Sequence, residues 1–466
     1  MAVSAKRIFF RLKQNASMWG ICSLAFLVSI CSFFGELYID LSRVGAVIAL
    51  VLQIIVEIRS CQRRFLTSPL FLLSIIGVFF FSVAQVIWEL DGPWPSEIRD
   101  FTLFVGSQAE AVILAFCMAC LVVYVIVSRK LCGGISQNVV PLPSVSKKTI
   151  GFLLIVPLIF LLFNLVTFLQ SEHEVIIPQF ITKLYFIVPP MIALSLCFLM
   201  RAALISGWLY KIGLFIQIGF VLGGLVYVGE SKTVVFIFIS LLFYGLRLFD
   251  FSFSRFVLVT IVAILFFLTF VQIIQHTSWK VGMISLTPTS ASYSRIFLGK
   301  GVWRQTETGY CFNNVIAAHT QDPFELSKQT FWLEGLLPRA FWPDKPSLSR
   351  GNIYASKYCL SHDSTLLNGH SASITLLGQP IVQGGLIGLV LHAGVLLLVL
   401  AGVEKLNRGR TTFSTALVVA LLPWLIDFDQ DFAMYVANAV KFALVMLILL
   451  IPIVLIERRD INRHLA

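Results

Sequence analysis

Residues 111–127 read AVILAFCMACLVVYVIV, seventeen consecutive residues without a charged side chain. The hydrocarbon core of a bilayer is about 30 Å thick, and a helix needs roughly 20 apolar residues to cross it. Together with its flanks, this stretch therefore predicts a membrane-crossing helix near residues 102–127.

Similar stretches recur along the whole chain. Of its 466 residues, 58% are hydrophobic and only 13% are charged, about half the charged fraction of an average soluble domain. This composition excludes a soluble globular protein. Hydropathy instead predicts an all-α polytopic integral membrane protein with about 12 transmembrane helices, near residues 17–34, 41–58, 68–88, 102–127, 149–169, 180–200, 211–228, 233–247, 254–275, 379–402, 411–426 and 434–456.

The charges between the predicted spans indicate the orientation of the chain. Basic residues gather at both termini and in the even-numbered connections, for example Arg59, Arg63 and Arg64, whereas the first odd-numbered loop carries Glu36 and Asp40. Because basic residues stay on the cytoplasmic side, both termini are predicted to be cytoplasmic. The net charge of +11 fits this topology and attraction to the cytoplasmic leaflet, so no nucleic-acid partner is expected.

One connection is much longer than the others and follows the ninth span, so it is predicted to lie outside the cytoplasm. It divides the chain into a bundle of spans 1–9 (residues 1–275), a large loop subdomain (276–378) and spans 10–12 with a cytoplasmic tail (379–466). Its many aromatic residues favour an ordered loop. Within it, Asp322 and Pro323 predict the start of a surface helix that ends at Pro338.

The loop also carries a short cationic run fixed by prolines, PRAFWPDKP at residues 338–346. Each proline locks φ, so Arg339 and Lys345 are expected to be held in place, which suits a phosphate ligand. Further cations of the loop are candidates for the same role: Arg295, Arg304 and Arg350. The alternative role for all five is salt bridging to nearby carboxylates or to lipid headgroups.

The PRAFWPDKP run, Gly351 and the later run HSASITLLGQPIVQGGLIGLVLHAG (residues 370–394) resemble the oligosaccharide repeat-unit polymerases, also called O-antigen polymerases. The resemblance covers the architecture of the whole chain and, at residue level, about residues 331–395. The second run is also similar to the O-antigen ligases. The resemblance implies a metal-independent glycosyltransferase, without a cofactor, that joins undecaprenyl-diphosphate-linked oligosaccharide units at the periplasmic face of the bacterial inner membrane.

The resemblance also implies a reaction and a set of partners. A sugar hydroxyl of one lipid-linked unit would attack the anomeric carbon of the chain on another, and the lipid diphosphate would leave. The loop cations would then bind the diphosphate, and a base would accept the hydroxyl proton. His370 is the favoured base, which the similarity to the ligases supports; Glu334 and His362 are the alternatives. The expected partners are lipid-linked oligosaccharides, membrane lipids, and a chain-length regulator and flippase of the same pathway.

Glu110, His392 and Lys441 are ionisable residues inside the predicted spans 4, 10 and 12. Charged groups are costly within a bilayer, so each is a candidate for support of a functional site. The alternative is a pairing between helices, and Lys441 either reaches up to the outer surface or pairs with Glu110.

Two cysteines, Cys311 and Cys359, are the only ones in the large loop. A loop outside a bacterial inner membrane faces an oxidising compartment, so a disulfide between them is predicted. No cysteine pair is flanked by histidines at metal-binding spacing, so no metal site is expected.

Two other functions remain open on the sequence. One is a flippase or transporter of lipid-linked oligosaccharides, because twelve spans with both termini inside are common among transporters. No six-plus-six repeat is visible, however, which speaks against that class. The other is an O-antigen-ligase-type glycosyltransferase.

Overall fold

The computed structural model describes residues 2–35, 38–59, 63–78, 107–132, 231–248, 308–336, 351–359, 373–408 and 412–465, together with positions 155, 193, 194, 196, 197, 212 and 342. Within these residues every regular element is a helix. The chain divides into two compact units, one of residues 1–136, 292–405 and 425–439, and the other of residues 137–291, 406–424 and 440–466.

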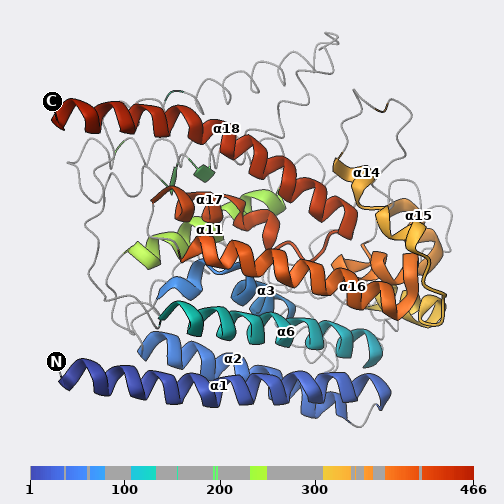
Figure 1. Ribbon diagram of the computed structural model, residues 1–466. Helices are drawn as coiled ribbons and strands as arrows, with labels where there is room; N and C mark the ends of the chain where they lie inside the picture. Colours follow the sequence, from blue (N-terminus) through green and yellow to red (C-terminus); the bar gives the residue numbers. More distant parts are fainter. Residues whose placement is uncertain are drawn as a thin grey trace, which may run out of the picture. The chain divides into compact units, whose positions relative to one another are not determined.

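The first unit is organised around helix α6 (Ser107–Cys132). Helix α1 (Ala2–Phe34) lies along α6 and along α2 (Ile39–Arg59), and the three run side by side in Figure 1. Most of α6 is buried, whereas most residues of the spans in α1 and α2 are at least partly exposed. This burial pattern is expected when α6 is enclosed by protein and its neighbours face lipid.

Helix α3 (Pro69–Gly77) packs against α6. It begins where Ser68 accepts a hydrogen bond from the amide of Phe71 (3.2 Å) and where Pro69 occupies the first turn. The hydroxyl of Ser74 donates to the carbonyl of Cys117 on α6 (2.8 Å), so the polar side chains of this interface are satisfied between the helices.

Five of the described helices are long and apolar enough to cross a membrane, within Ser17–Phe34, Ile39–Ile58, Gln108–Ser128, Thr375–Asn407 and Phe432–Pro452. They coincide with the predicted spans 1, 2, 4, 10 and 12. Three shorter helices coincide with parts of spans 3, 8 and 11: α3, α11 (Ser231–Leu248) and α17 (Thr412–Leu425). Predicted spans 5, 6, 7 and 9 lie outside the described residues, apart from the single positions named above. The chain is therefore a helical membrane protein.

The helix that contains predicted span 10, α16 (Thr375–Asn407), is broken at Gly384 and Gly385. A Cβ atom on Gly388 would lie 2.6 Å from the carbonyl oxygen of Pro380. Residues eight apart in a straight helix are separated by about 12 Å along the axis, so the two halves of α16 meet at a sharp corner.

The two halves of α16 have different surroundings. Every residue of 375–381 is buried, whereas residues 386–407 expose an apolar face that includes Ile387, Val390 and Leu398. At 1.5 Å per residue, the second half is about 33 Å long, enough to cross a bilayer. The predicted span at 379–402 therefore includes the corner, and the lipid-facing segment begins later, near residue 386.

The second unit contains α11, most of α17, and the later part of α18 (Phe432–Leu465). The guanidinium of Arg247 at the end of α11 donates to the side-chain oxygen and the carbonyl of Asn407 (2.6 and 3.1 Å). The rings of Trp424 and Phe442 lie 4.1 Å apart. Polar and aromatic contacts thus join segments that are far apart in the sequence.

The corner in α16 gives a stability prediction. Gly385 has a φ of +60° and a ψ of −154°, a conformation essentially restricted to glycine, and an added Cβ would lie 2.6 Å from the carbonyl oxygen of Asp322. Gly385→Ala should therefore destabilise the protein by at least about 1–3 kcal/mol, seen as a lower midpoint of thermal unfolding in detergent.

Gly394→Ala is the matched control, because Gly394 lies in the same helix with nothing within 4 Å of an added Cβ. It should leave the unfolding midpoint unchanged or raise it slightly. Equal midpoints for the two variants would contradict the corner at Gly385.

Candidate functional site

The described parts of the large loop, residues 308–336 and 351–359, together form what we call the loop lobe. It contains a helix at residues 308–319, the short segments η6 (Leu326–Thr330) and α14 (Leu333–Leu336), and α15 (Gly351–Tyr358). The prediction of one continuous surface helix from Asp322 to Pro338 is wrong. Residues 322–325 are not helical, and the carboxylate of Asp322 bonds a histidine side chain instead of capping a helix.

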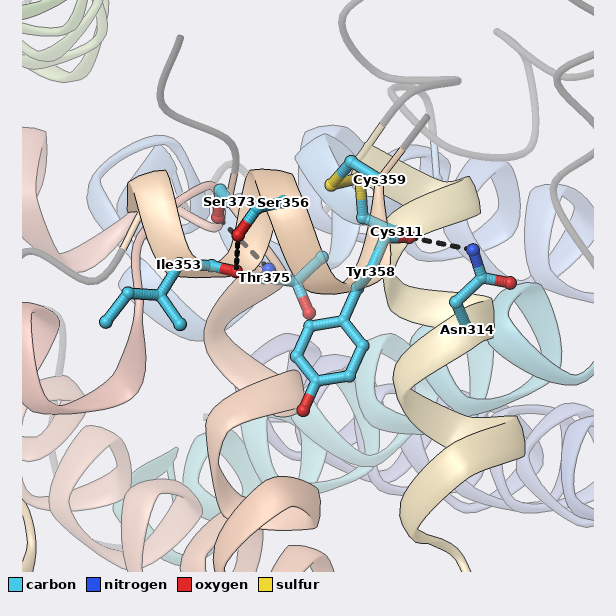
Figure 2. Close-up of a disulfide and its surroundings, with 8 residues drawn as sticks. All are labelled: Cys311, Asn314, Ile353, Ser356, Tyr358, Cys359, Ser373 and Thr375. Carbon is cyan, nitrogen blue, oxygen red and sulfur yellow. Dashed lines mark hydrogen bonds between the residues drawn. A yellow bond between two sulfur atoms is a disulfide. The ribbon is translucent and has the colours of Figure 1, made fainter. Parts of the chain in front are cut away.

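A disulfide joins the two pieces of the loop lobe. It links Cys311 to Cys359, the two cysteines that the sequence paired, and both are buried. Beside it, the amide of Asn314 donates to the carbonyl oxygen of Tyr358 (2.7 Å), as Figure 2 shows. These links hold α15 against the helix at 308–319, because they connect it through both a side chain and the backbone.

The loop lobe also reaches the corner in α16. A Cβ on Gly385 would lie within 3.4 Å of the carbonyl oxygens of His319, Thr320 and Asp322. The side chain of Gln329 is almost completely buried at the same corner, where its amide donates to the carbonyl oxygen of Gln383 (3.0 Å). The Gln329 side chain thus replaces one of the helical hydrogen bonds that the break removes.

One predicted span residue, His392, lies directly below this corner. Its ring sits between those of Phe331 on the loop lobe and Phe432 at the start of α18, at centroid distances of 5.2 and 5.1 Å. Its Nδ1 donates to the carbonyl oxygen of Gly388 (2.8 Å). His392 is therefore a buried contact between the lobe and two helices, which is the pairing role considered for it.

The first half of α16 begins at an unusual backbone conformation. Thr375 has a φ of +68°, which is rare for a β-branched residue, and it is completely buried. The hydroxyl of Ser373 accepts from the amide of Thr375 (3.1 Å), and the Thr375 hydroxyl accepts from the amide of Leu377 (3.2 Å). The amide of Leu376 donates to the carbonyl oxygen of Phe428, so this strained start is held by bonds on both sides.

A linked set of three side chains, which the sequence reasoning missed, lies at the end of the helix at 308–319. The Nδ1 of His319 is 2.6 Å from a carboxylate oxygen of Asp322, and its Nε2 is 2.6 Å from the hydroxyl of Tyr358. The spacing His319-x-x-Asp322 was the available signal, since residues three apart share one face of a helical turn. Nothing in the sequence indicated Tyr358, which comes from α15.

Most of the predicted site residues lie outside the described residues: His362, His370, Arg295, Arg304, Arg339, Lys345 and Arg350. Glu334 is described and lies half-buried on α14. Within the part of the chain that the structure describes, no group of three or more His, Cys, Asp or Glu side chains is arranged to hold a metal ion.

The intramembrane candidate Glu110 is paired with Arg43 of α2. The Nε and Nη2 atoms of Arg43 donate to the two carboxylate oxygens of Glu110 (2.8 and 2.7 Å), and Nη1 donates to Asp40 (2.9 Å). The carboxylate of Glu110 is fully buried. Lys441, suggested as its partner, lies on the exposed face of α18. Arg43 lies inside the predicted span 41–58 but was not among the predicted intramembrane residues.

The Arg43–Glu110 pair gives a prediction with a matched control. Glu110→Ala removes the buried partner of an arginine whose side chain is only 15% exposed, so it should lower the stability by about 3–5 kcal/mol. Asp40→Ala removes a carboxylate that is 82% exposed and should cost at most about 1 kcal/mol. Thermal unfolding in detergent compares the two variants, and an equal loss in both would contradict the buried pair.

No protein family, curated protein or solved structure matches this chain. Its function is therefore inferred from its own residues and their geometry.

Proposed function

We propose that this protein is a membrane glycosyltransferase that polymerises lipid-linked oligosaccharide repeat units on the outer side of a bacterial inner membrane. The loop lobe and the predicted cationic run then lie outside the cytoplasm, where lipid-diphosphate-linked sugars are presented after export. Both the acceptor and the donor are lipid-linked, so the enzyme needs membrane helices with lipid-facing surfaces beside an ordered polar lobe. The five apolar helices and the loop lobe supply these two parts.

The observation that carries the proposal is the anchoring of the chain on both sides of the run PRAFWPDKP. On the N-terminal side, Gln329 and Phe331 are fixed in the corner of α16 and against His392. On the C-terminal side, α15 is fixed by the disulfide at Cys359. Fixed flanks limit the conformations open to a segment between them, so such a segment loses less conformational entropy on binding than one with free ends.

The cations of this run suit the leaving group of the proposed reaction. Arg339 offers a planar fork for two phosphate oxygens, and Lys345 and Arg350 add positive charge. Charge builds up on the diphosphate as the glycosidic bond to it breaks, so cations held at that point lower the barrier. His370, which precedes the strained Thr375 by five residues, and Glu334 on α14 are proposed as bases for the attacking hydroxyl.

Reconstitution tests the proposal directly. The purified protein in liposomes, given lipid-linked repeat units without nucleotide and with excess chelator, should produce a ladder of longer lipid-linked chains. Arg339→Ala should abolish elongation, and Arg339→Lys should restore only part of it, because the ammonium lacks the bidentate fork. No ladder from the unmodified protein, or a ladder that requires ATP or a divalent metal, would show that the proposal is wrong.

Lys328→Ala is the control for the loss of a cation from the same lobe. Lys328 forms an exposed ion pair with Glu325 (2.8 Å) and should contribute little to either stability or catalysis. If it lowers elongation as much as Arg339→Ala does, Arg339 has no special role.

A second candidate, a flippase for the same lipid-linked units, is favoured by one observation. Broken membrane helices such as α16 are found at the substrate sites of many transporters. Here Gln329 and the backbone of residues 319–322 occupy the corner. Loss of a flippase would strand lipid-linked units on the cytoplasmic leaflet, whereas loss of a polymerase would leave single exported units.

A further inference from the structure

The linked side chains of Asp322, His319 and Tyr358 have a defined proton arrangement. An ionised carboxylate only accepts hydrogen bonds, so the Nδ1 of His319 must donate to Asp322. In a neutral imidazole the other nitrogen then carries no proton, and Nε2 accepts from the Tyr358 hydroxyl. The two hydrogen bonds therefore have the same direction: Tyr358 donates to His319, and His319 donates to Asp322.

The exposure of the three groups increases along the same direction. Tyr358 is 4% exposed, the His319 side chain 15% and the Asp322 side chain 45%. A proton that enters at the buried tyrosine thus has two short hydrogen bonds to follow to a carboxylate in contact with solvent.

The surrounding structure fixes all three groups. Tyr358 directly precedes the disulfide at Cys359, and Asn314 holds its carbonyl oxygen. The backbone carbonyls of His319 and Asp322 face the corner at Gly385. Geometry of this kind is needed for proton transfer, which requires donor and acceptor within hydrogen-bond distance.

A cation also lies beside Tyr358, the most buried of the three linked side chains. The ammonium of Lys357 is 5.1 Å from the centroid of the Tyr358 ring. A positive charge beside the ring favours negative charge that develops on Tyr358 when its proton moves to His319.

We propose that Tyr358, His319 and Asp322 form the acid–base relay of the glycosyl transfer, an inference that rests on the proposed function. The acceptor hydroxyl gives its proton to the Tyr358 oxygen as its own oxygen bonds to the anomeric carbon. Tyr358 passes its proton to Nε2 of His319, and the resulting imidazolium is stabilised by Asp322. The bond from the anomeric carbon to the lipid diphosphate breaks, and the diphosphate leaves with the electron pair.

In this scheme Tyr358, in place of His370 or Glu334, accepts the proton of the acceptor hydroxyl and is the catalytic residue, and His319 and Asp322 act through it. A purely structural role for the same three groups makes a different prediction. Their loss would then loosen the lobe, which would change substrate binding and the protection of the disulfide along with the rate.

The test compares the steady-state elongation kinetics of Tyr358→Phe and Asp322→Asn with those of the unmodified protein in liposomes. Thiol labelling without reductant checks in each case that Cys311 and Cys359 remain joined. Tyr310→Phe controls for loss of a hydroxyl from a half-buried tyrosine of the same lobe. Glu325→Gln controls for loss of a carboxylate, because Glu325 is 46% exposed and bonds Lys328 at the same i,i+3 spacing.

Tyr358→Phe should lower kcat by about 10²–10⁴-fold with KM unchanged and the disulfide intact. Asp322→Asn should lower kcat by a smaller factor, and both controls should elongate at the normal rate. Elongation at the normal kcat by Asp322→Asn and Tyr358→Phe overturns the relay while the polymerase proposal stands. If Tyr358→Phe does not fold, Asp322→Asn at the exposed end decides alone. A lack of elongation by the unmodified protein contradicts both proposals.

Discussion

The backbone at Gly385 turns α16 through a corner that a side chain would prevent. Its φ of +60° lies in a region that residues with a Cβ rarely occupy, and three carbonyl oxygens of the loop lobe fill the space that a Cβ would need. A break in a membrane helix releases backbone groups that need new partners, since lipid supplies none. Gln329 provides one of them at Gln383. The break and the loop lobe consequently depend on each other.

This corner also places the remaining parts of the candidate site. It separates a buried half-helix from a lipid-facing half. The buried half contacts the loop that precedes α18 through Leu376 and the first turn of α18 through Gln379. Behind the corner, His392 contacts both Phe331 and Phe432. The disulfide then fixes α15, and with it Tyr358, to the helix at residues 308–319 of the loop lobe. A membrane bundle thus carries an ordered polar lobe on its surface.

The sequence predicted the class of structure well, because helices that cross lipid must be long and apolar whatever else they do. Residues 111–127 are helical within α6, as their composition indicated, whereas the burial of this helix within protein was not predicted. The sequence did not reveal the corner in α16, since Gly384 and Gly385 lie within a segment whose mean hydropathy is that of a membrane span, and hydropathy does not register backbone conformation. Likewise, Arg43 and Tyr358 meet their partners only through tertiary packing. The capping signal at Asp322 was misleading, because its carboxylate bonds His319 instead of capping a helix.

Cross-linking tests most directly whether the loop lobe contacts the corner of α16. In a background without other reactive thiols, Gln329→Cys combined with Gly384→Cys places two thiols where the Gln329 amide now lies 2.5 Å from the position of a Gly384 Cβ. Gln329→Cys combined with Gly394→Cys is the control, because Gly394 has no neighbour within 4 Å of an added Cβ. A short thiol-specific cross-linker should join the first pair efficiently and the second pair poorly. Equal yields, or no cross-link in the first pair, would contradict this contact.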